Sequence, residues 1–192
     1  MSAPDAPRPA AIGTRRAEPR DAPALAALLR LLNDEPGLHP GRLTPDRVLH
    51  DLIEDPRAVV LLAERDGIAA GLATAHPTYD SGTARWGLFL NDLIVAPGSR
   101  RRGIARALLA AMAAEARRQG GAFLWWNGDE GDDLALAFHR ATGAAEANTV
   151  DFTLAGEVFD RMAGAASPGE GVAFPKPHPP GARRGPWTRV EE

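Results

Sequence analysis

The chain has 192 residues, of which 44% are hydrophobic and 24% charged, with a formal net charge of -3 at pH 7 and no cysteine. These values are typical of one ordinary globular domain, and the absence of cysteine excludes disulfides and thiolate metal sites. The charge disfavours a nucleic-acid-binding domain, and no apolar run approaches the about 20 residues of a membrane span. We therefore expect a soluble cytoplasmic protein that binds neither nucleic acid nor membrane.

Hydrophobic periodicity and turn residues divide the chain into strands and helices. In chain order, we expect a strand over 14–19, helices over 20–34 and 44–56, strands over 58–64, 68–80 and 85–95, a helix over 104–119, a strand over 122–126, a helix over 134–143, a strand over 149–154 and a short helix over 157–164. Leu25 and Leu29 are spaced to share one helix face, and Asp66 and Gly67 predict a hairpin turn. The continuous hydrophobicity of 85–95 indicates a central strand covered on both faces.

This order of elements predicts an α/β protein with a mixed sheet of the α+β type. The first half of that sheet is expected to be antiparallel. Residues 12–164 are expected to form the folded domain. Residues 1–11 are rich in Pro and Ala and are expected to be loose. Residues 165–192 lack periodicity and are rich in Pro and Gly, so we expect a tail.

A basic loop joins the expected central strand to the next helix and reads SRRRGIARALL over 99–109. The first turn of a helix has unpaired N–H groups and a partial positive charge, and Gly103 lets a ligand approach the backbone closely. The strand leading into the loop favours an anion site suited to pyrophosphate over a solvated basic loop. The chain contains neither G-x-x-x-x-G-K-[ST] nor G-x-G-x-x-G, so those two nucleotide motifs are excluded.

Arg100, Gly103 and Ala105 match the [QR]-x-x-G-x-[GA] signature, and here the chain resembles the GNAT superfamily of N-acetyltransferases. LFLNDLIVAPGSRRRGIARALL, HPTYD and LALAFHRATGA resemble segments of the diamine and polyamine acetyltransferase branch. The resemblance covers 14–162. It implies the GNAT fold, a central mixed sheet with helices on both faces, with acetyl-CoA as the donor in a slot between parting strands. By analogy with the branch, it also implies a homodimer.

The resemblance further implies which residues hold the donor. Leu93, Ile94 and Val95 would pair with the pantetheine arm, and the N–H near Val95 would stabilise the oxyanion that develops on the thioester. The pyrophosphate would lie on the loop and the first helical turn, formed by Arg100, Arg101, Arg102, Gly103, Ile104, Ala105 and Arg106. Asp132 stands where the family often has an Asn beside the coenzyme arm, although helix capping explains it equally well.

One departure from the family pattern concerns the general acid. Phe138 and His139 stand where the family segment usually reads Phe-Tyr, and that Tyr is the expected acid for the departing thiolate. A neutral imidazole still has one N–H to donate, so His139 is a candidate for the same role. A helix residue without a catalytic role is the alternative.

A second departure concerns the base. Asn91 and Asp92 stand where the central strand of the branch usually carries two acids. Asn91 cannot accept a proton, so Asp92 is the candidate electrostatic partner of a cationic amine, or a base acting through water. Adjacent strand residues face opposite sides, so only one of the two is expected to line the acceptor slot, and a bulge would change which one. A buried structural carboxylate is the alternative for Asp92, and the missing acid weakens the case for a polyamine acceptor.

Tyr79 and Trp86 are candidates for lining the acceptor pocket together with Asn91 and Asp92, and a simple turn is the alternative for the segment around Tyr79. The acidic turn NGDEGDD lacks the ligand spacing and the closing Glu of a calcium loop, so no metal site is expected.

These residues predict an acetyl-CoA-dependent N-acetyltransferase that moves an acetyl group to a primary amine of a small molecule. The amine would attack the thioester directly in a ternary complex, because no covalent acyl-enzyme is needed and the chain has no cysteine. Two other classes stay open. One is an acetyl-CoA-binding sensor without turnover, and the other is a protein N-acetyltransferase.

Overall fold

The computed structural model describes residues 12–36, 38–147, 149–150 and 152–165. These residues belong to two compact units, of which the first ends at Asn127 and the second begins at Gly128. The predicted loose segment 1–11 and nearly all of the predicted tail 165–192 lie outside the described residues. In the part of the chain that the structure describes, no helix has both the length and the apolar surface that crossing a membrane requires.

The first unit is built on a five-stranded sheet in the order β1-β2-β3-β4-β5. The strands are β1 (Ile12–Arg16), β2 (Val59–Arg65), β3 (Ile68–Asp80), β4 (Arg85–Val95) and β5 (Leu124–Trp125). The first four strands are antiparallel neighbours, and β5 runs parallel to β4. This arrangement confirms the predicted mixed sheet with an antiparallel first half. Asp66 and Gly67 connect β2 to β3 with φ values of 54° and 76°, as a tight hairpin turn requires.

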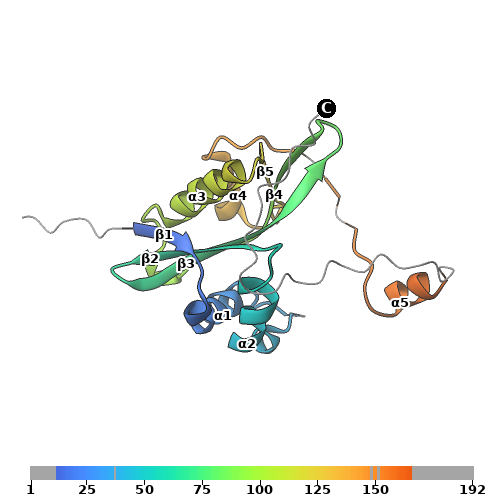
Figure 1. Ribbon diagram of the computed structural model, residues 1–192, viewed down its shortest axis with the longest axis horizontal. Coiled ribbons are helices and arrows are strands. Elements are labelled where there is room, and N and C mark those ends of the chain that lie inside the picture. The colour runs from blue at the N-terminus through green and yellow to red at the C-terminus, as the bar shows by residue number, and fades with distance from the viewer. Residues whose placement is uncertain (1–11, 37, 148, 151, 166–192) are drawn as a thin grey trace, which may run out of the picture. The chain divides into compact units, whose positions relative to one another are not determined.

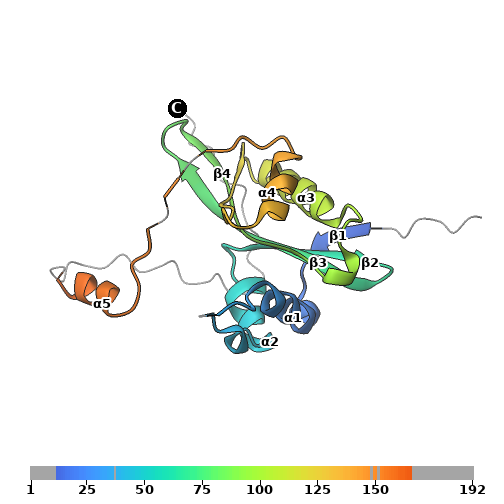
Figure 2. The same cartoon turned by 180° about the vertical axis from the view of Figure 1, so that it is seen from behind.

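Helices cover both faces of this sheet, as predicted (Figures 1 and 2). One face carries α1 (Ala22–Leu32) and α2 (Pro45–Val48), and the other carries α3 (Ile104–Arg118). The π-helical turn η3 (Leu49–Ile53) continues α2, and short 3-10 turns lie at η1 (Pro19–Asp21), η2 (Pro40–Arg42) and η4 (Pro97–Ser99). The strand β4 is therefore covered by helices on both faces, as expected, although β3 and not β4 is the central strand of the sheet.

The core between α1 and the sheet follows the predicted helix face. Leu25, Leu28 and Leu29 are each at most 4% exposed and belong to one cluster with Leu72 of β3 and Ile94 of β4. Burying a leucine side chain of this kind contributes about 1.5–3 kcal/mol. This packing holds the end of β4 firmly against α1.

On the opposite face, α3 packs closely against β3 and β4. Ile104, Leu108 and Met112 of α3 are at most 1% exposed. Gly71 of β3 makes the approach possible, because a Cβ there would lie 2.7 Å from the Ile94 carbonyl oxygen and 3.1 Å from Ile104 Cγ2. The beginning of α3 is thus fixed directly beside the end of β4.

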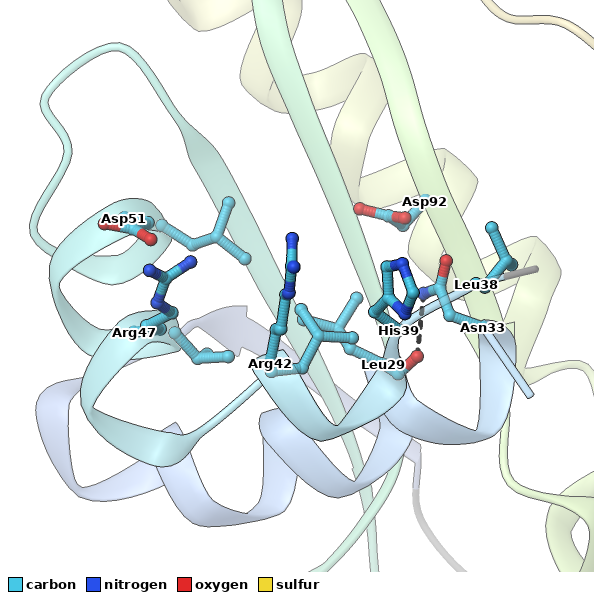
Figure 3. Close-up of a pocket in the computed structure, with 11 residues that line it drawn as sticks. Leu29, Asn33, Leu38, His39, Arg42, Arg47, Asp51 and Asp92 are labelled. Atoms are coloured by element: carbon cyan, nitrogen blue, oxygen red, sulfur yellow. Dashed lines mark hydrogen bonds between the residues drawn. The ribbon is translucent and has the colours of Figure 1, made fainter. Parts of the chain in front are cut away.

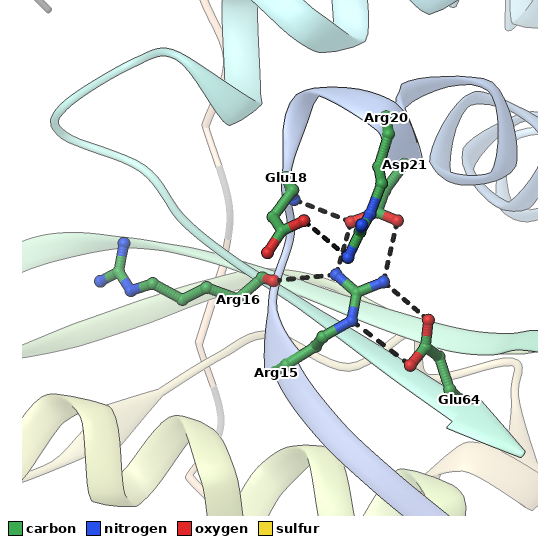
Figure 4. A network of polar contacts seen from close by, with 6 residues as sticks. All are labelled: Arg15, Arg16, Glu18, Arg20, Asp21 and Glu64. Carbon is green, nitrogen blue, oxygen red and sulfur yellow. Dashed lines mark hydrogen bonds and ion pairs between the residues drawn. The ribbon is translucent and has the colours of Figure 1, made fainter. Parts of the chain in front are cut away.

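Arg15 ties β1 to β2 and to the start of α1 (Figure 4). Its Nη1 and Nη2 donate to the two carboxylate oxygens of Asp21 at 2.6 and 2.9 Å, and its Nη2 also donates to Glu64 at 2.6 Å. The backbone N–H of Glu18 donates to Asp21 at 2.8 Å. Asp21 stands at the N-cap position of α1, but its carboxylate binds these partners and makes no capping hydrogen bond to the helix. The hydrogen bonds from Arg15 hold the pKa of Asp21 below its usual range.

The second unit contains α4 (Asp133–Arg140) and α5 (Gly156–Gly164). The strand predicted over 149–154 is wrong, because the described residues of that segment form no strand. Val150 and Phe152 are 76% and 93% exposed. Alternating apolar residues favoured the strand, but backbone groups form a strand only where a neighbouring edge pairs with them.

Candidate active site

The pairing of β3 with β4 is interrupted at Asn91. Thr74 pairs with Asp92 and Ala75 pairs with Leu90, which leaves Asn91 as the extra residue of a β-bulge. A bulge changes the direction of the side chains that follow it and is common near active sites. Asn91 is exposed, and its Oδ1 lies 2.8 Å from Nδ1 of His76.

Beyond the bulge, the outer edge of β4 is open. The ladder to β5 joins only Leu88 to Leu124 and Phe89 to Trp125 in the described residues, and does not reach the end of β4. The Ala96 N–H donates to the Ala70 oxygen at 2.9 Å, so the alternation of an antiparallel ladder turns the backbone N–H and C=O of Leu93 and Val95 away from β3. Among the described residues, the N–H and C=O of Leu93 and the N–H of Val95 form a strand edge of the kind that an extended ligand can join.

The open edge leads into the basic loop and the first turn of α3. Gly103 is the N-cap of α3 with a left-handed φ of 82°, and Arg101 also has a positive φ of 61°. The first helical bond runs from the Ala107 N–H to the Gly103 oxygen, so the N–H groups of Ile104 and Ala105 precede the helical ladder. An anion is favoured at such a helix start.

The predicted cofactor residues of this loop have different surroundings. Arg100, Arg101, Arg102 and Arg106 are exposed, whereas Ile104 is 1% exposed and offers only its backbone. The Arg100 Nε donates to the Val95 oxygen at 3.2 Å, which links the loop to the end of β4. The open edge, the helix start and the arginines together fit an extended ligand that ends in a pyrophosphate.

Asp92 lies on the face of β4 that α1 and α2 cover. The Thr74 hydroxyl donates a hydrogen bond to Asp92 Oδ2 across the β3–β4 pair. Burial raises the pKa of the Asp92 carboxyl, while this hydrogen bond and the nearby His76 act in the opposite direction. A half-buried carboxylate with a raised pKa is a stronger base than an exposed one.

Asp92 lines a pocket of about 410 Å³, which Figure 3 shows from close by. Its other polar lining residues are Asn33, His39, Arg42, Arg47 and Asp51, and leucines of α1 and of the segment around α2 supply its apolar part. Asn91 does not line this pocket, so of the two adjacent candidates only Asp92 does. Sequence reasoning missed the other polar residues. His39 and Arg42 lie in the Pro- and Gly-rich stretch over 35–43, which indicated only a loop, and the other three belong to expected helices and to no motif.

Tyr79 and Trp86 lie at the far end of the β3–β4 hairpin, where they pair with each other in register. Their ring centroids are 5.2 Å apart. Tyr79 lines a second pocket of about 360 Å³ together with Phe123 and Trp125. Tyr79 and Trp86 therefore lie far from Asp92 along β3 and β4, and neither lines the pocket that Asp92 lines.

His139 and Asp132 belong to the second unit. Asp132 caps α4, since its Oδ1 accepts a hydrogen bond from the Ala135 N–H at 2.9 Å, as the capping alternative implies. Burial lowers the pKa of His139, and Asp132 raises it by a smaller amount. His139 is therefore a neutral imidazole at pH 7, and its N–H is its only proton to donate.

No group of three or more His, Cys, Asp or Glu side chains suited to a metal ion occurs among the described residues.

The chain matches the model of the acetyltransferase (GNAT) family over residues 25–144. It is 26% identical over 132 residues to YhfO of Bacillus subtilis (strain 168), an uncharacterized N-acetyltransferase, and the match covers 69% of this chain and 89% of YhfO. It is 35% identical over 153 residues to the mycothiol acetyltransferase of Kineococcus radiotolerans, which covers 77% of this chain. The match spans only 46% of that longer relative.

Among solved structures, the aminoglycoside N-acetyltransferase AAC(6')-Iy in complex with CoA is similar with a TM-score of 0.67. The likeness covers 78% of this chain and 98% of that one at 23% identity, and it shows a common fold. Because the family match spans more than half of the chain, this protein is an N-acetyltransferase of the GNAT family.

Proposed function

We propose that the protein transfers the acetyl group of acetyl-CoA to a primary amine of a small molecule, which attacks the thioester directly in a ternary complex. The observation that carries this proposal is the position of β4 between two sites. Its open edge at Leu93 and Val95 leads to the loop at Gly103, and Asp92 of the same strand faces the pocket under α1. The end of β4 would hold the donor and the acceptor next to each other. Much of the acceleration of acetyl transfer would then come from positioning the two reactants.

The donor would bind along β4. In this proposal, the outward backbone groups of Leu93 and Val95 hold the pantetheine arm, whereas those of Ile94 face β3 and are not available to it. The pyrophosphate lies on the backbone over 101–106, with Arg100 nearby. CoA is bound in the solved structure of AAC(6')-Iy, which supports the same donor here. The donor supplies the activated acetyl thioester.

The acceptor enters as an ammonium ion. Asp92, directly or through one water, takes a proton from it, and the nitrogen lone pair then forms a bond to the acetyl carbon. The Val95 N–H faces the open edge and donates to the carbonyl oxygen as that oxygen gains negative charge. The nitrogen in this intermediate is cationic and loses its second proton to solvent as the carbon–sulfur bond breaks. The departing thiolate takes a proton, for which His139 is the proposed donor, and His139 regains a proton from solvent. The products are the N-acetylated amine and CoA.

Other expectations from the sequence stay predictions. These are the likeness to the diamine and polyamine branch, the homodimer and the cytoplasmic location. The relatives with named substrates are aminoglycoside and mycothiol acetyltransferases, so they support small-molecule acceptors in general.

The proposal is tested by following CoA release with a thiol reagent across diamines, polyamines, amino acids, aminoglycosides and short peptides. Release that depends on one class of small amine supports the proposal. Release only with peptides would indicate a protein acetyltransferase. Tight binding of acetyl-CoA without release on any acceptor would indicate a sensor.

A further inference from the structure

The pocket beside Asp92 contains positive as well as negative charge. Arg42 is the last residue of η2 and Arg47 lies in α2, and both line the pocket with Asp92. In the view of Figure 3, Arg42 stands between Arg47 and Asp51 on one side and Asp92 and His39 on the other. The pocket therefore offers a carboxylate at one end and guanidinium groups toward the other.

Within the described residues, neither guanidinium has a carboxylate partner. Arg15 shows the contrasting case, since it is held by Asp21 and Glu64. Asp51 lines the same pocket as Arg42 and Arg47, yet it forms no ion pair with either in this part of the chain. A guanidinium is charged at every accessible pH and matches a carboxylate or phosphate with two parallel hydrogen bonds.

We infer that the acceptor carries an anionic group as well as the amine that is acetylated, so that it is an amino-acid-like molecule. This inference rests on the function proposed above. The amine lies toward Asp92, and the anionic group is held by Arg42 with Arg47 beside it. A pocket of about 410 Å³ suits a molecule of this size.

The same charges act against other acceptors. A molecule with several amines and no anion places positive charge beside two guanidinium groups, which weakens its binding. Leu29, Leu43 and Leu52 line the same pocket and favour an acceptor that also carries an apolar side chain. The pocket should therefore favour acceptors with an anionic group, whereas a pocket lined by acids alone would favour acceptors with several amines.

Matched acceptors test the inference. Leucine, leucine methyl ester and isoamylamine share one amine and one apolar chain but differ in the carboxylate, and phosphoethanolamine against ethanolamine tests a phosphate in its place. We expect the wild type to prefer leucine over its uncharged counterparts by about 10- to 100-fold in kcat/KM, the range of a charge-assisted hydrogen bond. The variant R42Q/R47Q should bring that ratio close to one, and R42K should retain part of it.

R30Q is the matched control, because Arg30 is an exposed arginine of α1 that does not line the pocket. It should keep the wild-type ratio. Equal use of leucine and isoamylamine by the wild type, or a preference unchanged in R42Q/R47Q, would overturn the inference while leaving the proposed function intact. A preference for phosphoethanolamine over leucine would identify a phosphate as the anion.

A binding measurement separates the two proposals. Calorimetric titration of the CoA-bound protein with N-acetylleucine and with N-acetylisoamylamine measures the affinity of the pocket for each compound without turnover. Tighter binding of the carboxylate, lost in R42Q/R47Q, supports the inference even if no acceptor releases CoA. Equal or absent binding of both compounds overturns it.

Discussion

Thr74 and Asp92 face each other across β3 and β4, and the Thr74 hydroxyl donates a hydrogen bond to the Asp92 carboxylate. Thr74 is fully buried, so this donor is held in place by packing. The hydrogen bond favours the charged form of Asp92 and partly offsets the effect of burial on its pKa. The basicity of the proposed catalytic carboxylate therefore depends on its neighbour in the sheet.

Thr74→Val removes that donor with little change in shape. The pKa of Asp92 should rise further, so the acidic limb of the pH profile of kcat/KM should move to higher pH. Thr14→Val, on the exposed β1, is the control and should leave the profile unchanged. A profile that Thr74→Val does not move would show that another group sets the acidic limb.

Asp92→Asn should lower kcat/KM by about 10²- to 10⁴-fold, because an amide cannot accept the proton. The same variant should be more stable at neutral pH. The pKa of Asp92 is raised in the fold, so ionisation destabilises the folded state once the pH exceeds the ordinary value of about 3.9. The gain in thermal stability should be small near pH 4 and larger at pH 7. A loss of stability at pH 7 would contradict this account.

Gly103→Ala should raise the KM for acetyl-CoA and reduce the free energy of unfolding by about 1–2 kcal/mol. A Cβ at Gly103 would meet nothing within 4 Å, so the effect comes from its φ of 82°. Gly98→Ala in the same loop is the matched control, because a Cβ there also meets nothing and its φ is not in the left-handed region. Equal behaviour of the two variants would remove the conformational explanation.

His139→Phe tests the proposed general acid. If the neutral imidazole protonates the leaving thiolate, kcat should fall by about 10²-fold, at the low end of such effects, with little change in the KM for acetyl-CoA. Steady-state kinetics with both substrates varied separates the two constants. An unchanged kcat would mean that His139 is only a helix residue.

Glu115 on α3, away from the site, is expected to contribute to the stability of the fold in a pH-dependent way. Burial alone would raise its pKa, but hydrogen bonds from Arg118, Arg16 and Gln119 lower it to about 2. The ionised Glu115 carboxylate therefore stabilises the folded state fully above its ordinary pKa of about 4.3. This contribution to the free energy of unfolding is lost as the pH falls toward 2. Glu115→Gln should cost about 1–2 kcal/mol at pH 7, since solvent screens the partly exposed arginines, and the difference should shrink in acid. Glu35→Gln, at an exposed residue, should show neither effect in denaturant titrations.

Much of the fold follows from local patterns in the sequence. The apolar spacing around Leu25 marked α1, and Asp66 and Gly67 marked the β2–β3 hairpin. The run over 85–95 gave β4 its observed bounds. Elements that depend on a distant partner were less predictable. The segment over 122–126 is a strand only over Leu124–Trp125, where it is in register with Leu88 and Phe89, although Ala122 and Phe123 also form backbone hydrogen bonds with β4.

The site was predictable where it depends on one stretch of chain. The signature around Gly103 indicated the anion site because its residues are consecutive. The pocket beside Asp92 was not predictable, because Arg42, Arg47 and Asn33 reach it only once α1 and α2 pack on the sheet. The bulge at Asn91 depends on the register with β3, which the sequence of β4 alone does not specify.

Direct transfer of an acetyl group from acetyl-CoA to a small amine leaves no acetyl group on the protein. Mass spectrometry of a mixture of the protein, isotope-labelled acetyl-CoA and the acceptor panel tests it most directly. We expect the labelled acetyl group on one amine product and none on the protein, with or without acceptor. A labelled protein that delivers its label when an acceptor is added would contradict direct attack, and label that stays on CoA with every acceptor would contradict acetyl transfer to a small amine.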